Sequence, residues 1–409
     1  MRALVVNGPG VIRQSNRVAI LRYLRAGGAV SRPQIAEAVG LSRPTVANLV
    51  DELVAEGLVR EVGLGQSTRS GGKRPGLVKL NPDAAAVAAV AIGVEQVEAG
   101  IIKLDGHVAR RRQAPMPAAV GPEAGLDLVR RMLSDLLTEY GREPHAPVLG
   151  VGASAPGVVH PATGVVAFSP ALPGWRDVPL GPELARATGL PVTLDSECRA
   201  QTLGEVWFGQ GQEVGDLVGL VTGAGIGAGV VMDGLIYRGP DDSAGEIGHT
   251  TLDPLGARCH CGNMGCWEVY SSTAGLLRMV RDALWRGEFS TLGDRVGNDL
   301  GRLTLPMVLD AVRCGDTLAR RYAVDEMGYR LGVGIANLVN TFNPEMVVLF
   351  GPITALGEEL LERIRTTVRT RALPQAGARA RIVCSLLGAD GPLVGAATLV
   401  ISRLFSVAH

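Results

Sequence analysis

Four metal-ligating residues near the middle of the chain most constrain its fold. Three cysteines, Cys259, Cys261 and Cys266, are spaced C-x-C-x4-C, and His249 precedes the first of them by ten residues. Three thiolates and one imidazole nitrogen make a complete tetrahedral set for Zn²⁺ and leave no coordination position for water. The sequence therefore predicts a structural zinc site that fixes the shape of this loop. His260 lies inside the cluster and is an alternative nitrogen donor.

The same stretch resembles a family signature. Glu246-Ile247-Gly248-His249, followed by C-x-C-G-x-x-G-C-x-E, is similar to the signature of the ROK family, which groups sugar-responsive transcriptional repressors with sugar kinases. The resemblance implies two actin-like α/β lobes around a cleft, in which Glu246, His249 and Glu268 contact a sugar. The chemistry is suitable, because zinc would fix the imidazole while the carboxylates accept hydrogen bonds from sugar hydroxyls.

The composition is that of a globular protein. A chain of 409 residues with 46% hydrophobic and 20% charged residues is long enough for two or three domains. It has neither a secretion-signal pattern nor an apolar run of about 18 residues, so we expect no membrane contact. Cysteines grouped for metal binding fit a reducing compartment, and the expected location is the cytoplasm.

Charge is divided unevenly along the chain, although the net charge is zero. Residues 1–80 contain twelve Lys and Arg against five Asp and Glu, a net of +7, and the remainder therefore carries −7. A basic N-terminal region on an acidic body is typical of a protein whose one end binds a polyanion.

Residues 1–80 have the pattern of a winged helix–turn–helix. A loose arm, residues 1–15, is expected before a first helix that starts at Asn16. Ser31 and Ser42 are suitable N-caps for two further helices, and Gly40 permits the turn between them. Residues 57–62 and 77–80 are expected to form a hairpin whose connecting loop, the wing, is basic.

A double-stranded DNA operator is the predicted partner of this region. Arg43 is suited to read guanine and Asn48 adenine, while the wing contacts phosphates or the minor groove. The alternative is a small helical packing module with a solvated basic loop. A two-fold protein reads a pseudo-palindrome, so we expect a homodimer or a dimer of dimers. The predicted DNA contacts are Ser42, Arg43, Thr45 and Asn48 on the third helix, and Arg69, Lys73 and Arg74 in the wing.

From residue 84 onwards, short apolar strands alternate with helices, which predicts an α/β fold. The expected architecture is an N-terminal winged helix–turn–helix followed by a two-lobed actin-like, sugar-kinase-like body. We expect the head at residues 1–80, one lobe at 84–195 and a second at 196–409, whose last helix can return to the first lobe. The glycine run 222–229 resembles the second phosphate loop of the actin-like superfamily, or is a packing turn.

Departures from the kinase pattern predict that the chain is not an enzyme. The family's first phosphate loop, D-x-G-G-T, has Ala91, Val94 and Glu95 in place of the aspartate, a glycine and the threonine. A valine side chain blocks close backbone approach, and a glutamate places like charge beside a polyphosphate. At the adenosine end, Phe350 and Pro352 flank a single glycine where a glycine cluster is expected.

The effector position keeps a carboxylate. The family's N-D-x-N reads Ser196-Glu197-Cys198-Arg199, and Glu197 is one methylene longer than the catalytic aspartate it replaces. A longer side chain can still accept a hydrogen bond from a sugar, but it is less well placed to remove a proton. Ser196 is a further candidate for hydrogen bonding to the sugar. Arg199 suggests a charged or phosphorylated sugar, unless it packs inside the protein.

These residues, together with the family resemblance, predict a sugar-responsive transcriptional regulator that acts as a repressor of carbohydrate-related genes. The competing hypotheses are a sugar kinase with an added DNA-binding head and a ligand-independent regulator.

Overall fold

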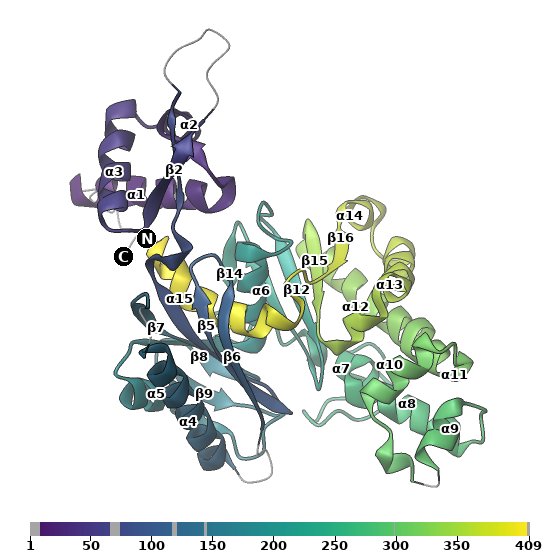
Figure 1. The fold of residues 1–409 in the computed structure, drawn as a ribbon. Coiled ribbons are helices and arrows are strands. Elements are labelled where there is room, and N and C mark those ends of the chain that lie inside the picture. The colour runs from purple at the N-terminus through teal and green to yellow at the C-terminus, as the bar shows by residue number, and fades with distance from the viewer. Residues whose placement is uncertain (1–8, 66–73, 117–120, 143–144, 298, 407–409) are drawn as a thin grey trace.

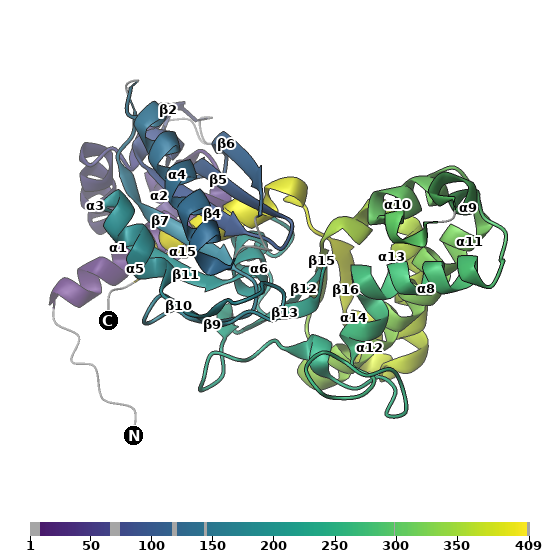
Figure 2. The same ribbon diagram turned by 90° about the horizontal axis from the view of Figure 1, so that it is seen from below.

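The computed structural model describes residues 9–65, 74–116, 121–142, 145–297 and 299–406. A small N-terminal head sits on one of two α/β lobes, and the long C-terminal helix runs beneath it (Figure 1). Viewed from the perpendicular direction, the two lobes lie side by side (Figure 2). Within the described ranges, no helix is long and apolar enough to cross a membrane.

The head, residues 9–80, combines three helices with a three-stranded sheet of order β1-β3-β2. Ser31 starts α2 with a capping box, because its hydroxyl accepts the amide of Gln34 and the Gln34 side chain accepts the amide of Ser31. Gly40 ends α2 in the left-handed conformation, with φ of 66°. The elements are α1 (Pro9–Gly27), β1 (Val30–Ser31), α2 (Arg32–Val39), α3 (Arg43–Ala55), β2 (Val59–Leu64) and β3 (Gly76–Leu80).

The expected loose arm is wrong for residues 9–15, because α1 already begins at Pro9. Arg13 pairs with Glu52 on α3, and Arg17 makes a bidentate pair with Glu56, the C-cap residue of α3. These partners lie 39 residues away in the sequence, so no local periodicity predicts the ion pairs.

The first lobe is a five-stranded sheet of order β11-β7-β4-β5-β6. Strand β4 pairs parallel with β7 and antiparallel with β5, and β7 pairs parallel with β11. Helices α4 and α5 pack on one face, and α15 packs on the other. The elements are β4 (Ala86–Ile92), β5 (Gln96–Lys103), β6 (Val108–Pro115), α4 (Pro122–Tyr140), β7 (Val148–Ala155), α5 (Leu180–Thr188), β11 (Val192–Ser196) and α15 (Gly391–Leu404), with a small sheet of β8 (Val158–His160), β9 (Val165–Phe168) and β10 (Arg176–Val178).

The second lobe repeats the plan with the order β14-β13-β12-β15-β16. A π-helical turn at Arg321–Glu326 separates α11 from α12. The elements are β12 (Leu217–Thr222), β13 (Ile226–Met232), β14 (Leu235–Tyr237), α7 (Trp267–Ser271), α8 (Thr273–Trp285), α9 (Thr291–Val296), α10 (Leu305–Arg313), α11 (Thr317–Arg320), α12 (Met327–Phe342), β15 (Met346–Phe350), α13 (Gly357–Arg371), α14 (Pro374–Arg379) and β16 (Arg381–Cys384).

Helix α6 (Glu197–Phe208) lies between the second sheet and α15. It approaches both through glycines. A Cβ added at Gly229 would stand 2.3 Å from Thr202 Oγ1, and one added at Gly204 would stand 3.0 Å from Gly395 Cα. Because bare backbone meets backbone or a short side chain at these points, α6 holds the two lobes in close contact.

We predict that Gly395→Ala destabilises the protein by about 1–3 kcal/mol, the usual cost of overpacking a close contact. The new Cβ would stand 2.6 Å from the carbonyl oxygen of Ala200, so α15 must move away from α6. Urea unfolding measures the effect. Gly391→Ala on the same helix is the matched control, because its Cβ would be 3.6 Å from its nearest neighbour. Equal unfolding midpoints for the two variants would contradict the packing argument.

Candidate functional site

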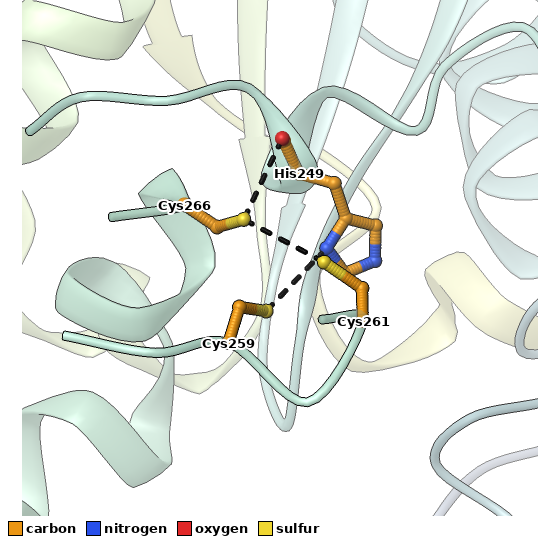
Figure 3. A group of neighbouring side chains, drawn as sticks. All are labelled: His249, Cys259, Cys261 and Cys266. Carbon is orange, nitrogen blue, oxygen red and sulfur yellow. Dashed lines mark hydrogen bonds between the residues drawn. The ribbon is translucent and has the colours of Figure 1, made fainter. Parts of the chain in front are cut away.

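The four predicted metal ligands converge on one point (Figure 3). The imidazole nitrogen of His249 and the sulfurs of Cys259, Cys261 and Cys266 all lie within 4.8 Å of one another. Cys259 Sγ is 3.7 Å from His249 Nδ1, and Cys261 Sγ is 3.7 Å from Cys266 Sγ. Ligands about 2.0–2.3 Å from a tetrahedral ion are separated by such distances. The residues present therefore fit a metal ion.

Local backbone geometry produces this arrangement. A 3-10 turn, Ile247–His249, presents the histidine, and α7 begins directly after Cys266. Gly262 and Gly265 have φ of 97° and 63°, which turn the intervening loop back on itself. At Gly265 a Cβ would stand 1.6 Å from the carbonyl oxygen of Asp253, so a side chain does not fit there.

His260, the alternative donor, approaches Cys259 but does not form one ligand group with all three cysteines. Its Nδ1 is 3.4 Å from Glu268 Oε1 and 3.8 Å from Cys259 Sγ, and 53% of its side chain is exposed. With His249 and Glu268 it forms a second group of possible ligands that share the same histidine. His249 is thus the better placed nitrogen for the cysteine cluster.

Glu268 joins the metal loop to the glycine run. Its Oε2 accepts the amide of Ile226 at 2.9 Å, and a Cβ at Gly225 would stand 2.5 Å from the same oxygen. The glycine run is further closed by the amide of Gly223, which donates to the carbonyl of Gly225 at 2.9 Å. One carboxylate oxygen of Glu268 is therefore structural, and the other is left for a ligand or for His260.

Two further acids lie close to these residues. Glu246 precedes the 3-10 turn, and desolvation raises the pKa of its carboxyl while the charges of His249 and Arg199 oppose the rise. Glu197 is half-buried in the first turn of α6, where desolvation raises its pKa to about 7 against the hydrogen bond from Gln201. The charge of Glu268 acts on Glu246, and the charges of Glu197 and Glu246 both act on Cys198, so the three acids surround one partly desolvated region.

Ser196 is occupied as a helix cap. Its hydroxyl accepts the amide of Arg199 at 3.4 Å, and its own amide donates to Asp195 Oδ1 at 2.7 Å. The hydroxyl retains its proton for a hydrogen bond to a ligand.

Arg199 does not support a charged sugar, and that interpretation was wrong. The side chain is 3% exposed, and its Nε donates to Asp195 Oδ1 at 2.7 Å. Its Nη1 and Nη2 donate to the carbonyls of Asp242 and Val159 at 2.8 Å and 3.4 Å. With its donors directed at protein acceptors, the guanidinium holds structure together instead of facing a phosphate.

Sequence reasoning missed the partners of this arginine. Arg238 Nη2 lies 2.5 Å from Asp195 Oδ2, so Asp195 joins two guanidinium groups. We call Asp195, Arg199 and Arg238 the latch, because they tie the segment that leads to Glu246 onto the first lobe. The available signal was the four-residue spacing between Asp195, near the end of β11, and Arg199, in the first turn of α6.

The residues at the positions compared with the kinase nucleotide motifs differ in their burial. Ala91 and Phe350 are buried, whereas Glu95 is exposed at the β4–β5 turn next to half-buried Val94. The carbonyl of Phe350 accepts the Thr222 hydroxyl at 2.7 Å. Pro352 opens the 3-10 turn Pro352–Leu356 directly after β15.

The DNA-facing candidates are divided between exposed and engaged side chains. Arg43, Asn48 and Arg74 are exposed. Ser42 caps α3 by accepting the amide of Thr45, and the two hydroxyls are 2.7 Å apart, so both serve the helix start. Arg69 and Lys73 lie outside the described residues.

We predict that Glu197→Gln removes part of a pH dependence of stability. The folded-state pKa is raised from 4.5 to about 7, so the folded chain keeps a proton that the unfolded chain loses between these values. Stability therefore falls as pH rises through this window, and the variant lacks that contribution. Thermal melting at pH 5 and pH 8 measures the difference.

The exposed Glu213 provides the control for that experiment, because Glu213→Gln should melt with the wild-type pH dependence. Glu246 contributes in the same direction, so the decline in Glu197→Gln is reduced and not abolished. An unchanged decline in Glu197→Gln would show that this carboxyl is not desolvated.

Both the head and the body of this chain match patterns of known protein families. The ROK family pattern matches residues 87–403, and a winged helix–turn–helix DNA-binding pattern matches residues 13–60. The chain is 33% identical over 401 residues to a xylose repressor of Caldicellulosiruptor bescii, covering 97% of this chain and 98% of that protein. It is 32% identical over 315 residues to a glucokinase of Thermotoga maritima, covering 77% of this chain and 97% of the glucokinase.

A solved structure of a ROK family transcriptional regulator, a homologue of the Escherichia coli Mlc protein, superimposes with a TM-score of 0.81. It is 26% identical and covers 97% of both chains. The expected winged head and sugar-kinase-like body are thereby confirmed. The chain belongs to the ROK family and carries an N-terminal winged helix–turn–helix of the DNA-binding type.

Proposed function

We propose that this protein is a transcriptional repressor that responds to a sugar or sugar derivative bound beside Glu197, Glu246 and Glu268. One observation carries the proposal. The same chain has a head of the DNA-binding type and a body in which acidic residues lie beside a metal-ligand cluster. The full-length similarity to a xylose repressor supports it, since the head and the body are both covered. The proposed bounds are residues 1–80 for the head and 84–195 and 196–409 for the lobes.

Zinc is the proposed metal. Three thiolates and one imidazole are the donor set that zinc prefers in closed structural sites. His249, Cys259, Cys261 and Cys266 would hold it, and the ion would supply a fixed loop shape without an open position for chemistry. The three acids and His249 would then bind and orient sugar hydroxyls, with Ser196 as a further donor.

Glucokinase is the second candidate function, because the body is similar to a glucokinase over nearly its whole length. The substitutions at Ala91, Val94 and Glu95, with Phe350 and Pro352 at the other end, favour a body that binds sugar without transferring phosphate. The coupling of sugar to DNA would be a population shift, in which sugar binds two arrangements of the head with different affinities. Homodimerisation is proposed from the two-fold symmetry of bacterial operators.

We expect Glu246→Ala to abolish sugar heat in calorimetry while metal content stays at one zinc per chain. Cys266→Ser should lose both the metal and the sugar heat, because the loop that carries Glu268 is no longer pinned. D-xylose and D-glucose are the probes, and metal content is measured on the same samples by elemental analysis. Sugar heat from the metal-free variant, or ATP turnover above about 1 s⁻¹ by the wild type, would contradict the proposal.

The DNA claim is tested by comparing Arg43→Ala with Arg74→Ala on duplexes selected from a random library. Arg43 is exposed at the start of α3, so its loss should relax base choice and cost about 1–3 kcal/mol on preferred sequences. Arg74 is exposed in the wing, and its loss should weaken binding to all duplexes alike and lower the salt slope by about one. Binding isotherms at several salt concentrations distinguish these outcomes, and identical behaviour of the two variants would count against both roles.

A further inference from the structure

Helix α6 has its two ends in different parts of the molecule. Its first turn carries Glu197 among the cleft acids, and its last turn carries Trp207 beside the head. Twelve residues span about 18 Å at 1.5 Å per residue, so one rigid element reaches from the proposed sugar site to α1.

Two arginines of α1, Arg22 and Arg25, make polar contacts with the ends of α15 and α6. Arg25 Nη1 donates to the carbonyl of Trp207 at 3.2 Å, and its guanidinium carbon lies 4.1 Å from the centroid of the Trp207 ring. The same ring packs edge-on against Phe405, with centroids 5.1 Å apart. Arg22 Nε in turn donates to the carbonyl of Phe405 at 3.0 Å. The ends of α6 and α15 therefore meet α1 at a single joint.

Movement of α6 cannot be absorbed along its length. Its middle packs against glycines, with Thr202 facing Gly219 and Gly229, and Gly204 facing Gly395. Such contacts lack flexible side chains that could rearrange, so a shift at Glu197 is passed to Trp207 as a shift of the whole helix.

The joint is also electrostatically sensitive. Burial lowers the pKa of Arg25 to about 10, and the charge of neighbouring Arg22 adds to that effect. Arg25 Nε is buried with no hydrogen-bond partner among the described residues. Arg25 is a half-buried cation whose described contacts are the carbonyl and the ring of Trp207, so its position depends on where Trp207 lies.

We propose that Arg25 is the positioning residue through which α6 sets the orientation of the DNA-binding head in response to the sugar site. The inference rests on the proposed function and adds the path by which the sugar site acts on the head. In this role Arg25 touches neither sugar nor DNA. It acts through Trp207, and its loss uncouples two binding sites that each remain intact.

Amide hydrogen exchange of the full-length protein, with and without saturating D-xylose or D-glucose, tests the proposal. In the wild type, sugar should change the exchange protection of residues 18–27 by about fivefold or more, the lower end of allosteric couplings. In Arg25→Met, which keeps the side-chain length but lacks donor and charge, that change should fall below about twofold. The sugar Kd, measured by calorimetry, should stay within about threefold of the wild-type value.

Two further variants separate coupling from simple damage. Arg25→Lys retains a cation and a donor and should restore part of the response. Arg13→Met removes an arginine from the same helix that pairs with Glu52 inside the head, and it should respond like the wild type. A full response in Arg25→Met with normal sugar binding overturns the inference alone. Absence of sugar heat in the wild type overturns the proposed function, and the inference falls with it.

Discussion

The arrangement of both lobes depends on close contact of α6 with its neighbours. Glycines on β12, β13 and α15 allow that approach, and a single Cβ at these positions would require backbone to move. The gain is dispersion energy over a long, dense interface, together with a unique register between the lobes. The disadvantage is that substitutions at these contacts are poorly tolerated, since no flexible side chain there can rearrange to make room. The same stiffness makes α6 suitable for carrying a displacement from one end of the body to the other.

The acids of the site are held from two directions. On one side, the metal-ligand cluster fixes His249 and the loop that ends at Glu268. On the other, the latch ties the segment before Glu246 to the first lobe through the buried carboxylate of Asp195. Desolvation raises the pKa of both Glu197 and Glu246, and the charge of Glu268 adds to the rise at Glu246. Hydroxyl donors from a sugar would relieve both costs, whereas an anion would add to them.

Features encoded by short spacings could be predicted from the sequence, and those that depend on distant partners could not. The caps of α2 and α3 and the four metal-ligating residues are local patterns, and the structure places them as the patterns indicate. The start of α1 was misjudged because its ion pairs reach across to α3. The role of Arg199 was misjudged for the same reason, since its acceptors at Val159 and Asp242 are 40 or more positions away. Base-reading assignments on α3 remain predictions.

The aromatic corner formed by Trp207 and Phe405 has a consequence for relatives that consist of the body alone. Here the head and the first lobe share one hydrophobic cluster, and α1 covers this corner. A large aromatic side chain buries roughly 150–250 Å². A protein without the head but with the same residues would therefore expose an apolar patch that is prone to aggregation. A body without this head would therefore need smaller or more polar side chains at the ends of α6 and α15, or another partner that covers them.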